Sequence, residues 1–319
     1  MSDTIIQRDR YKGVDSIVIE NDTVRAVILP GRGAKIASLA LKRPDLPATE
    51  SLWQIPEEKY GYQPRYGDVF GGEDGSGYDD MFPSISPYTP KEGPWEGIPF
   101  PDHGEVWSIP WECSVLDGGL ICSVHGIRIP CRISRTLTLE ERTLRLTYTL
   151  QNCCGFPLSF QWAAHAIFRV SRGSTLLVPE GMDEIINAFD GRRLQKAGKR
   201  YRFPRFAGPS GGDLRIIPGP EVRDCQKYWF AGPVPEGWCG IRNPDTGLET
   251  TVSFDPGKTP YLGIWVNAGG WNDSFNIGIE PSSSIMDDPE AAKAFKGESS
   301  LEARETREWE IRLELNSYL

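Results

Sequence analysis

Short runs in which apolar and polar residues alternate cover most of the chain, and they constrain its fold more than any other feature. The alternation is clearest between Arg142 and Asn152, where every second residue from Leu144 to Leu150 is apolar. A period of two residues is that of a β-strand with one buried and one solvated face. The chain also has 34 glycines and 26 prolines, and many of them separate these runs. The sequence therefore predicts an all-β fold, a large antiparallel β-sandwich.

Further runs of the same kind give the expected order of strands. They span residues 15–29, 35–42, 109–116, 119–125, 127–140, 250–254, 261–267, 276–280 and 309–315. A single helix is expected between the last two of these runs, because Asp287 or Asp288 can cap it and Pro289 suits its first position. Gly297 would end it. No break in composition marks a linker, so residues 1–319 are expected to form a single domain.

The segment 60–101 differs from the rest, since it is rich in glycine, proline and aromatic residues and has few alternating runs. A loop of this length inside a compact protein usually has a function. Its aromatic residues argue against disorder. We therefore expect this segment to be an ordered loop beside a binding groove.

The composition excludes several classes of function and location. The 319 residues suffice for a substantial core, and the net charge of −9 argues against general binding to nucleic acids or anionic membranes. No apolar run is long enough to span a bilayer. The seven cysteines have no CxxC spacing, their number is odd, and no secretory signal precedes them. Reduced thiols and a cytoplasmic location are therefore expected.

Two of the expected strands carry an acid and a base on faces with small residues. In the run 275–281 the apolar residues form one face, and Gly278 and Glu280 lie on the other. Glycine weakens a strand, and beside a carboxylate it leaves room for a ligand. The run 159–168 places His165 between alanines in the same way. Each residue alone is more often a core or salt-bridged residue, but together they indicate a site.

His103 is a further candidate, because it lies where the aromatic loop is expected to meet a strand. Asp102, Glu105 and Trp107 surround it in the sequence. Ligand contacts are often made at such junctions. His125 precedes a glycine in an ordinary strand and is interpreted as a structural residue.

Six short motifs, in chain order, resemble those of the galactose mutarotase (aldose 1-epimerase)-like family. They are PGRGAKI at 30–36, GYDDMFP at 77–83, DHGE at 102–105, WAAH at 162–165, YLGIW at 261–265 and GIEP at 278–281. The similarity runs over most of the length of the chain, in the same order. The resemblance implies a mutarotase-like sandwich and an isomerase that acts on a small sugar without a metal or organic cofactor.

The resemblance also implies roles for three residues. Glu280 is expected to remove the proton from the anomeric hydroxyl, and His165 to protonate the ring oxygen. His103 is expected to steady the ring-oxygen side. A carboxylate near His165 would favour its charged form, so that it holds the proton it must donate.

Five further side chains are candidates for contacts with the sugar. They are Asp80, Arg32, Trp265, Tyr78 and Glu105. Flat aromatic rings suit the C–H faces of pyranoses, although tryptophans also fill cores. The strand parity of Trp265 favours a position in the groove. Trp162 has the opposite parity to His165 and is expected in the core.

The substrate is left open by two features of the sequence. His165 is followed by Ala166, Ile167 and Phe168, whereas the acid histidine of sugar mutarotases is usually followed by Pro-Tyr-Phe, and their central aspartate has no clear counterpart here. Seven basic residues lie within 192–205, a stretch without acidic residues. Such a run is usually a solvated surface loop. If it covered the groove, it would favour an anionic sugar that bears phosphate, sulfonate or carboxylate.

Three alternatives to a mutarotase of neutral sugars therefore stay open. The first is the same enzyme acting on a phosphorylated or sulfonated sugar. The second is a non-catalytic carbohydrate-binding protein on the same fold, since fold does not fix function. The third is an accessory domain of a lyase or glycosidase, which is disfavoured because one sandwich accounts for the whole chain.

Overall fold

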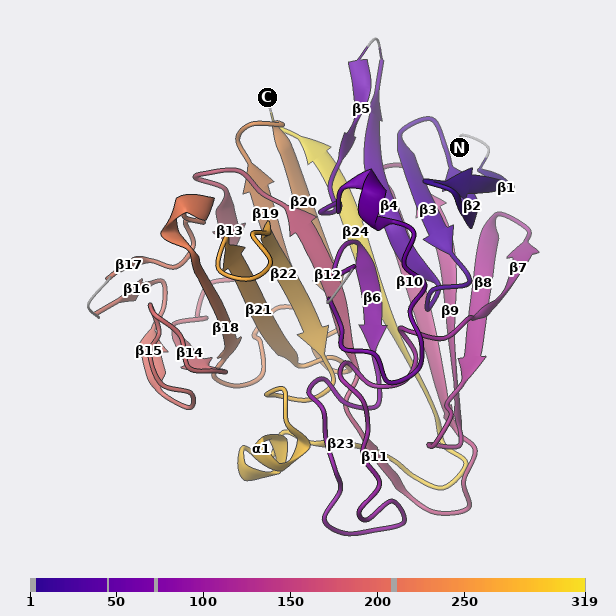
Figure 1. Ribbon diagram of the computed structural model, residues 1–319, viewed down its shortest axis with the longest axis vertical. Coiled ribbons are helices and arrows are strands. Elements are labelled where there is room, and N and C mark those ends of the chain that lie inside the picture. The colour runs from indigo at the N-terminus through magenta and orange to yellow at the C-terminus, as the bar shows by residue number, and fades with distance from the viewer. Residues whose placement is uncertain (1–3, 45, 72–73, 208–210, 319) are drawn as a thin grey trace.

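The structure is a computed structural model that describes residues 4–44, 46–71, 74–207 and 211–318 (Figure 1). Within these ranges, two large antiparallel sheets of twelve and eight strands make up most of the molecule. One hydrophobic cluster joins them, to which Ile28 and Ile279 contribute from the larger sheet and Leu146 and Leu313 from the smaller. The molecule is thus a β-sandwich, and the predicted fold class is confirmed.

The larger sheet has the strand order β1-β2-β3-β4-β6-β12-β22-β21-β18-β14-β15, and β5 pairs with β4. Its strands span Ile5–Tyr11 (β1), Val14–Glu20 (β2), Val24–Leu29 (β3), Lys35–Arg43 (β4), Leu46–Glu50 (β5), Tyr78–Met81 (β6), Ala163–Arg169 (β12), Glu184–Asn187 (β14), Arg200–Arg202 (β15), Asp224–Phe230 (β18), Tyr261–Ala268 (β21) and Phe275–Ser282 (β22). Strands β12, β22 and β21 are neighbours in the middle of this sheet. Segments that are distant in the sequence therefore meet there.

The smaller sheet has the strand order β13-β19-β20-β24-β10-β9-β8-β7. Its strands span Glu112–Leu116 (β7), Gly119–His125 (β8), Cys131–Glu140 (β9), Thr143–Asn152 (β10), Thr175–Leu177 (β13), Trp238–Asn243 (β19), Leu248–Phe254 (β20) and Thr306–Ser317 (β24). Two short pairs complete the strands: Leu158–Phe160 (β11) with Ser299–Leu301 (β23), and Arg205–Phe206 (β16) with Gly212–Asp213 (β17). Strands β10 and β24 bury alternate residues, as their sequences predict.

The expected helix is present as α1, Pro289–Ala294. The side chain of Asp288 caps it, because its carboxylate accepts hydrogen bonds from the backbone N–H groups of Glu290 and Ala291. Two short 3₁₀ helices span Glu57–Lys59 (η1) and Pro220–Val222 (η2). In the described ranges, no helix is both long and apolar enough to cross a membrane.

Six strands of the larger sheet were not predicted from the sequence: β1, β5, β6, β14, β15 and β18. Strand β6 lies inside the segment 60–101 that was expected to be a loop, and β18 lies in a stretch without alternation. All four residues of β6 are buried, as are six of the seven in β18. A strand covered on both faces has no solvated face, so the signal with a period of two residues is missing.

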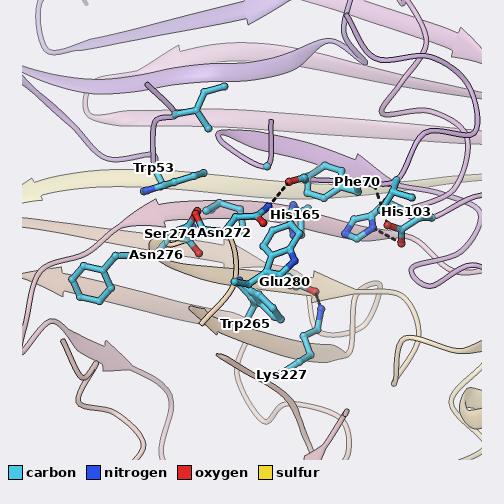
Figure 2. A pocket seen from close by; sticks show the side chains of 18 of the residues that line it. Trp53, Phe70, His103, His165, Lys227, Trp265, Asn272, Ser274, Asn276 and Glu280 are labelled. Carbon is cyan, nitrogen blue, oxygen red and sulfur yellow. Dashed lines mark hydrogen bonds and ion pairs between the residues drawn. The ribbon is translucent and has the colours of Figure 1, made fainter. Parts of the chain in front are cut away.

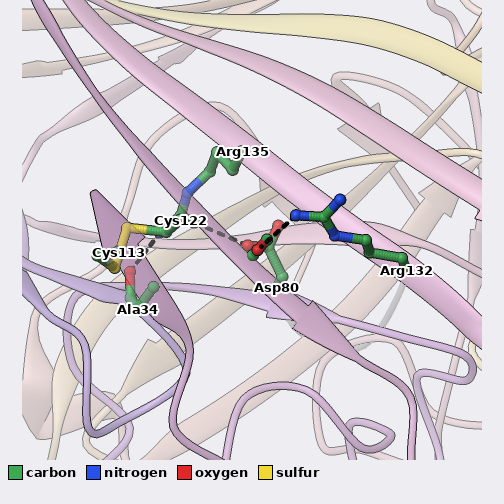
Figure 3. The surroundings of a disulfide bond; sticks show 7 residues. Ala34, Asp80, Cys113, Cys122, Arg132 and Arg135 are labelled. Atoms are coloured by element: carbon green, nitrogen blue, oxygen red, sulfur yellow. Dashed lines mark hydrogen bonds and ion pairs between the residues drawn. A yellow bond between two sulfur atoms is a disulfide. The ribbon is translucent and has the colours of Figure 1, made fainter. Parts of the chain in front are cut away.

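One pair of cysteines contradicts the expectation that all thiols are reduced. Cys113 in β7 and Cys122 in β8 lie opposite each other in the register and form a disulfide (Figure 3). The five other cysteines are free. The prediction was wrong for this pair because it considered metal-ligand spacing and a secretory signal, whereas the bond arises from the register of a hairpin.

Candidate active site

A cavity of about 920 Å³ lies on the face of the larger sheet that points away from the core (Figure 2). Its wall includes His165 from β12, Trp265 from β21 and Glu280 from β22, together with His103 from the loop before β7. Lys227 from β18 also lines it. The three proposed catalytic residues are thus gathered in one cavity.

The strand register explains why His165 and Glu280 meet. Strands β12 and β22 pair with Ala166 opposite Ile279, which places His165 opposite Glu280. Directly opposed residues in an antiparallel pair have Cβ atoms about 4.5–5.5 Å apart. Ile279 points into the core on the other face of the sheet. The assignment of faces from the sequence is therefore confirmed for both strands.

The carboxylate of Glu280 is fully buried and has two different oxygens. Oε2 accepts a hydrogen bond from the ammonium group of Lys227, whose Nζ is also 3.5 Å from Asp287 Oδ1. Oε1 has no hydrogen-bond partner among the described residues. Burial raises the pKa of Glu280, and the charge of Lys227 opposes this shift. One oxygen is therefore fixed while the other is free to accept a proton.

His165 is neutral at neutral pH, which corrects the expectation from the sequence. Burial lowers the pKa of His165 far below its ordinary value, and the positive charges of His103, Lys227 and Lys35 lower it further. The expectation was that Glu280 would favour the charged ring. In the structure, Lys227 already balances that carboxylate.

This arrangement predicts how the stability of the fold depends on pH. In the unfolded chain His165 takes up a proton near its ordinary pKa of about 6.5, whereas in the folded state it does so only at lower pH. Its contribution to stability is thus complete above about pH 6.5 and is lost as the pH falls toward the folded pKa.

Urea unfolding of the wild type and of His165→Asn, at pH 7.5 and pH 5, measures this contribution. We expect the wild type to lose more unfolding free energy than the variant on acidification. The exposed His125 provides the control, because His125→Asn should lose as much as the wild type. Equal losses in the wild type and in His165→Asn would contradict the assignment.

His103 has a carboxylate partner, in contrast to His165. Its Nδ1 lies 3.0 Å from Asp102 Oδ1, and its ring stacks on Phe70 with 4.1 Å between the ring centres. The rings of His103 and His165 are 5.0 Å apart. His103 has a left-handed backbone conformation with φ of 58°, which is uncommon for residues other than glycine and is often found at functional sites. The contact with Asp102 fixes the orientation of the ring.

Trp265 is the one predicted sugar-contacting residue that lines this cavity. Its ring centre is 5.9 Å from that of Phe189 and 6.2 Å from that of Trp271. Trp53 and Phe70 line other parts of the wall. The cavity thus presents several aromatic faces, as a pyranose site requires.

Asp80 and Tyr78 do not line the cavity, although both were predicted to contact the sugar. Asp80 is fully buried, and its carboxylate accepts hydrogen bonds from Arg135 Nη1 at 2.7 Å and from Trp162 Nε1 at 3.1 Å. Tyr78 lies in the core and shares a hydrogen bond of 2.9 Å with the hydroxyl of Tyr148. Both belong to β6, which is buried throughout, so these side chains stabilise the sandwich. Trp162 lies in the core as predicted.

Glu105 and Arg32 do not line the cavity either. Glu105 accepts hydrogen bonds from the hydroxyl of Tyr66 at 2.9 Å and from the backbone N–H of Arg128 at 3.0 Å, and it therefore ties loops together. Arg32 donates to the carbonyl oxygen of Tyr60 at 2.8 Å and lines a separate cavity beside β1 and β2. We do not include these four residues in the proposed site.

The sequence reasoning missed Lys227 and Asp287. Lys227 is in β18 and holds Glu280, and Asp287 precedes α1 and accepts a hydrogen bond of 3.0 Å from Trp229 Nε1. A signal was present, because three large apolar residues, Tyr228, Trp229 and Phe230, directly follow Lys227. A buried lysine requires a carboxylate partner, and this rule points to Glu280.

The basic run does not cover the cavity. The wall of the cavity includes none of the seven basic residues of this run, which are Arg192, Arg193, Lys196, Lys199, Arg200, Arg202 and Arg205. Three of them form ion pairs with nearby acids: Lys196 with Asp190, Arg200 with Glu184 and Arg202 with Asp183. The run is a solvated surface segment, as such runs usually are.

Comparison with known proteins identifies the fold. No protein-family model matches the sequence, and no curated protein sequence matches it. Solved structures do match over nearly the whole chain. The Slr1438 protein of Synechocystis sp. PCC 6803 has a TM-score of 0.71 at 17% identity and covers 99% of this chain and 100% of its own.

Two further solved structures have the same fold. A candidate aldose 1-epimerase of Escherichia coli K12 has a TM-score of 0.63 at 18% identity, over 98% of this chain and 99% of that one. A galactose mutarotase related enzyme of Lactobacillus acidophilus has a TM-score of 0.64 at 15% identity, over 95% and 97%. The chain therefore has the fold of the galactose mutarotase-like proteins.

Proposed function

We propose that the protein is an aldose 1-epimerase that interconverts the α and β anomers of a free sugar. The observation that carries this proposal is the cross-strand pair of Glu280 and His165, which lies in one aromatic cavity with His103. A carboxylate and two imidazoles around one space are the groups that ring opening needs.

Glu280 acts as the base. Oε1 takes the proton from the anomeric hydroxyl as the bond between C1 and the ring oxygen breaks, which leaves an open-chain aldehyde. Lys227 holds Oε2, so the carboxylate keeps its orientation during the transfer. Positioned proton transfer of this kind accelerates a reaction by about 10²–10⁴-fold.

The two histidines act on the ring oxygen. Since His165 is neutral, we assign the transferred proton to His103, whose ring is oriented by Asp102. His165 contributes a hydrogen bond at the same oxygen. Rotation about C1–C2 and transfer of both protons in the reverse direction give the other anomer.

A neutral sugar suits this cavity better than an anionic one. The lysine beside the proposed acid–base groups, Lys227, is already paired with Glu280 and Asp287, and the other lysine of the wall, Lys59, is exposed. The basic run pairs with acids on the surface. The wall offers aromatic faces instead, which favour the C–H surface of an uncharged ring.

Exchange spectroscopy by NMR on the wild-type protein tests the function. Freshly purified protein is added to a panel of neutral and phosphorylated aldoses, and the rate of exchange between α and β signals is compared with buffer. We expect faster exchange for neutral sugars. Rates equal to buffer for every sugar would contradict the proposal and favour a carbohydrate-binding protein without activity.

A further inference from the structure

The cavity extends along the sheet well beyond the acid–base pair. Glu280 and Asn276 lie on the same face of β22, four residues apart, and both line the cavity. At about 3.3 Å per residue, this separation is about 13 Å. The volume of the cavity, about 920 Å³, is near the upper end for sites that hold drug-sized ligands. A single hexose at Glu280 leaves the part near Asn276 empty.

The floor between these two residues is apolar. Gly278 lies midway, and its cross-strand neighbours are Ile167 in β12 and Trp265 in β21. A Cβ atom at Gly278 would be 3.0 Å from Ile167 Cδ1 and 3.1 Å from Trp265 Cβ. The two side chains thus close over the glycine and form a continuous surface on which a second sugar ring can lie.

The far end has a polar group without a partner. Asn276 is only 4% exposed, and its Oδ1 has no hydrogen-bond partner among the described residues. Buried carbonyl oxygens are usually satisfied, so this atom marks a place where a ligand hydroxyl would donate. Ser274 and Asn272 line the same region.

Trp53 completes this end of the cavity with an aromatic face. Its backbone is held in place, because its N–H donates to the carbonyl oxygen of Ile167 at 2.8 Å and its own carbonyl accepts from Gly77 at 3.2 Å. In Figure 2, Trp53 and Asn276 lie toward one side of the view and His103 toward the other, with Glu280 between them.

We propose that Trp53, Ile167, Trp265 and Asn276 form a second sugar subsite, so that the substrate is the reducing end of a disaccharide or a longer neutral oligosaccharide. The reducing ring lies at Glu280, His165 and His103. The next ring stacks over the apolar floor and donates a hydroxyl to Asn276 Oδ1. The inference rests on the proposed function, because it assigns the reacting ring to the acid–base end.

The test compares the rate constants kcat/KM for anomer exchange of reducing disaccharides with those of monosaccharides. Cellobiose, maltose, lactose and melibiose are measured beside glucose and galactose by NMR exchange spectroscopy. We expect at least one disaccharide to be preferred over its monosaccharide by about tenfold, which corresponds to one or two well-made contacts in the second subsite.

Two variants test which residues cause the preference for disaccharides. Asn276→Leu removes the acceptor at similar volume, and Trp53→Ala removes the aromatic face, so each should lower the ratio of disaccharide to monosaccharide kcat/KM several-fold. Asn316→Leu, on β24 outside the cavity, is the matched control and should leave the ratio as in the wild type. The two variants remove side chains from different segments, so one of them remains informative if the other fails to fold.

The outcomes separate the two proposals. Exchange of monosaccharides alone, or a ratio that neither variant changes, overturns the second subsite and leaves the proposed function standing. Rates equal to buffer for every sugar overturn both. A disaccharide preference that falls in both variants supports the subsite.

Discussion

Glu280→Gln is expected to lower the rate of anomer exchange by about 10²–10⁴-fold, to near the rate in buffer. The amide cannot accept a proton at the position of Oε1, which is the free oxygen of the carboxylate. Glutamine has nearly the same shape, and Lys227 keeps Asp287 as a partner at 3.5 Å. The fold should therefore persist.

NMR exchange rates and far-UV circular dichroism of the same samples measure both parts of this expectation. Glu314→Gln, an exposed position on β24, is the matched control and should keep the wild-type rate. His165→Ala should also lower the rate, because it removes a donor at the ring oxygen. Exchange at more than a tenth of the wild-type rate in Glu280→Gln would exclude this residue as the base.

Asp80→Ala is expected to lower the free energy of unfolding by about 3–5 kcal/mol, because it leaves the buried guanidinium of Arg135 without its carboxylate. Both side chains of this ion pair are fully buried, with 2.7 Å between Arg135 Nη1 and Asp80 Oδ2. The loss is a large part of the about 5–15 kcal/mol that stabilises typical domains. Urea unfolding monitored by tryptophan fluorescence measures it.

A double variant separates the ion pair from other effects of the truncation. Asp80→Ala combined with Arg135→Met removes both charges and should recover part of the lost stability, since apolar pairs often replace buried ion pairs without loss. The original interpretation of Asp80 as a sugar contact predicts a different result. In that case KM would rise while the unfolding free energy stayed near the wild-type value.

The sequence predicted those parts of the fold in which one strand face is solvated. Strands β10 and β24 alternate visibly, and α1 has its cap and its proline in the expected places, although it ends at Ala294 and the left-handed residue after it is Lys296 rather than Gly297. Strands β6 and β18 were missed because they are covered on both sides and lack a solvated face, and β1 and β5 were missed because they are largely exposed and lack a buried face. Local patterns report exposure, so they are silent where a strand has none.

The same limit explains which site residues could be predicted. Glu280, His165 and Trp265 are polar or aromatic residues on the non-core faces of strands with small neighbours, and their parity alone placed them in the cavity. Asp80 was predicted to contact the sugar because its motif resembles one of the mutarotase-like family. Its actual ion-pair partner, Arg135, is 55 positions away in the chain. Sequence spacing cannot identify such a pairing.

The disulfide between Cys113 and Cys122 has a consequence for handling the protein. Strand β7 is the last strand of the smaller sheet, and Val115 and Leu116 on it are 61% and 44% exposed. An outermost strand with apolar side chains can recruit a second molecule through its free backbone groups. The covalent link keeps this strand on its neighbour, so thiol reductants in storage buffers should promote aggregation.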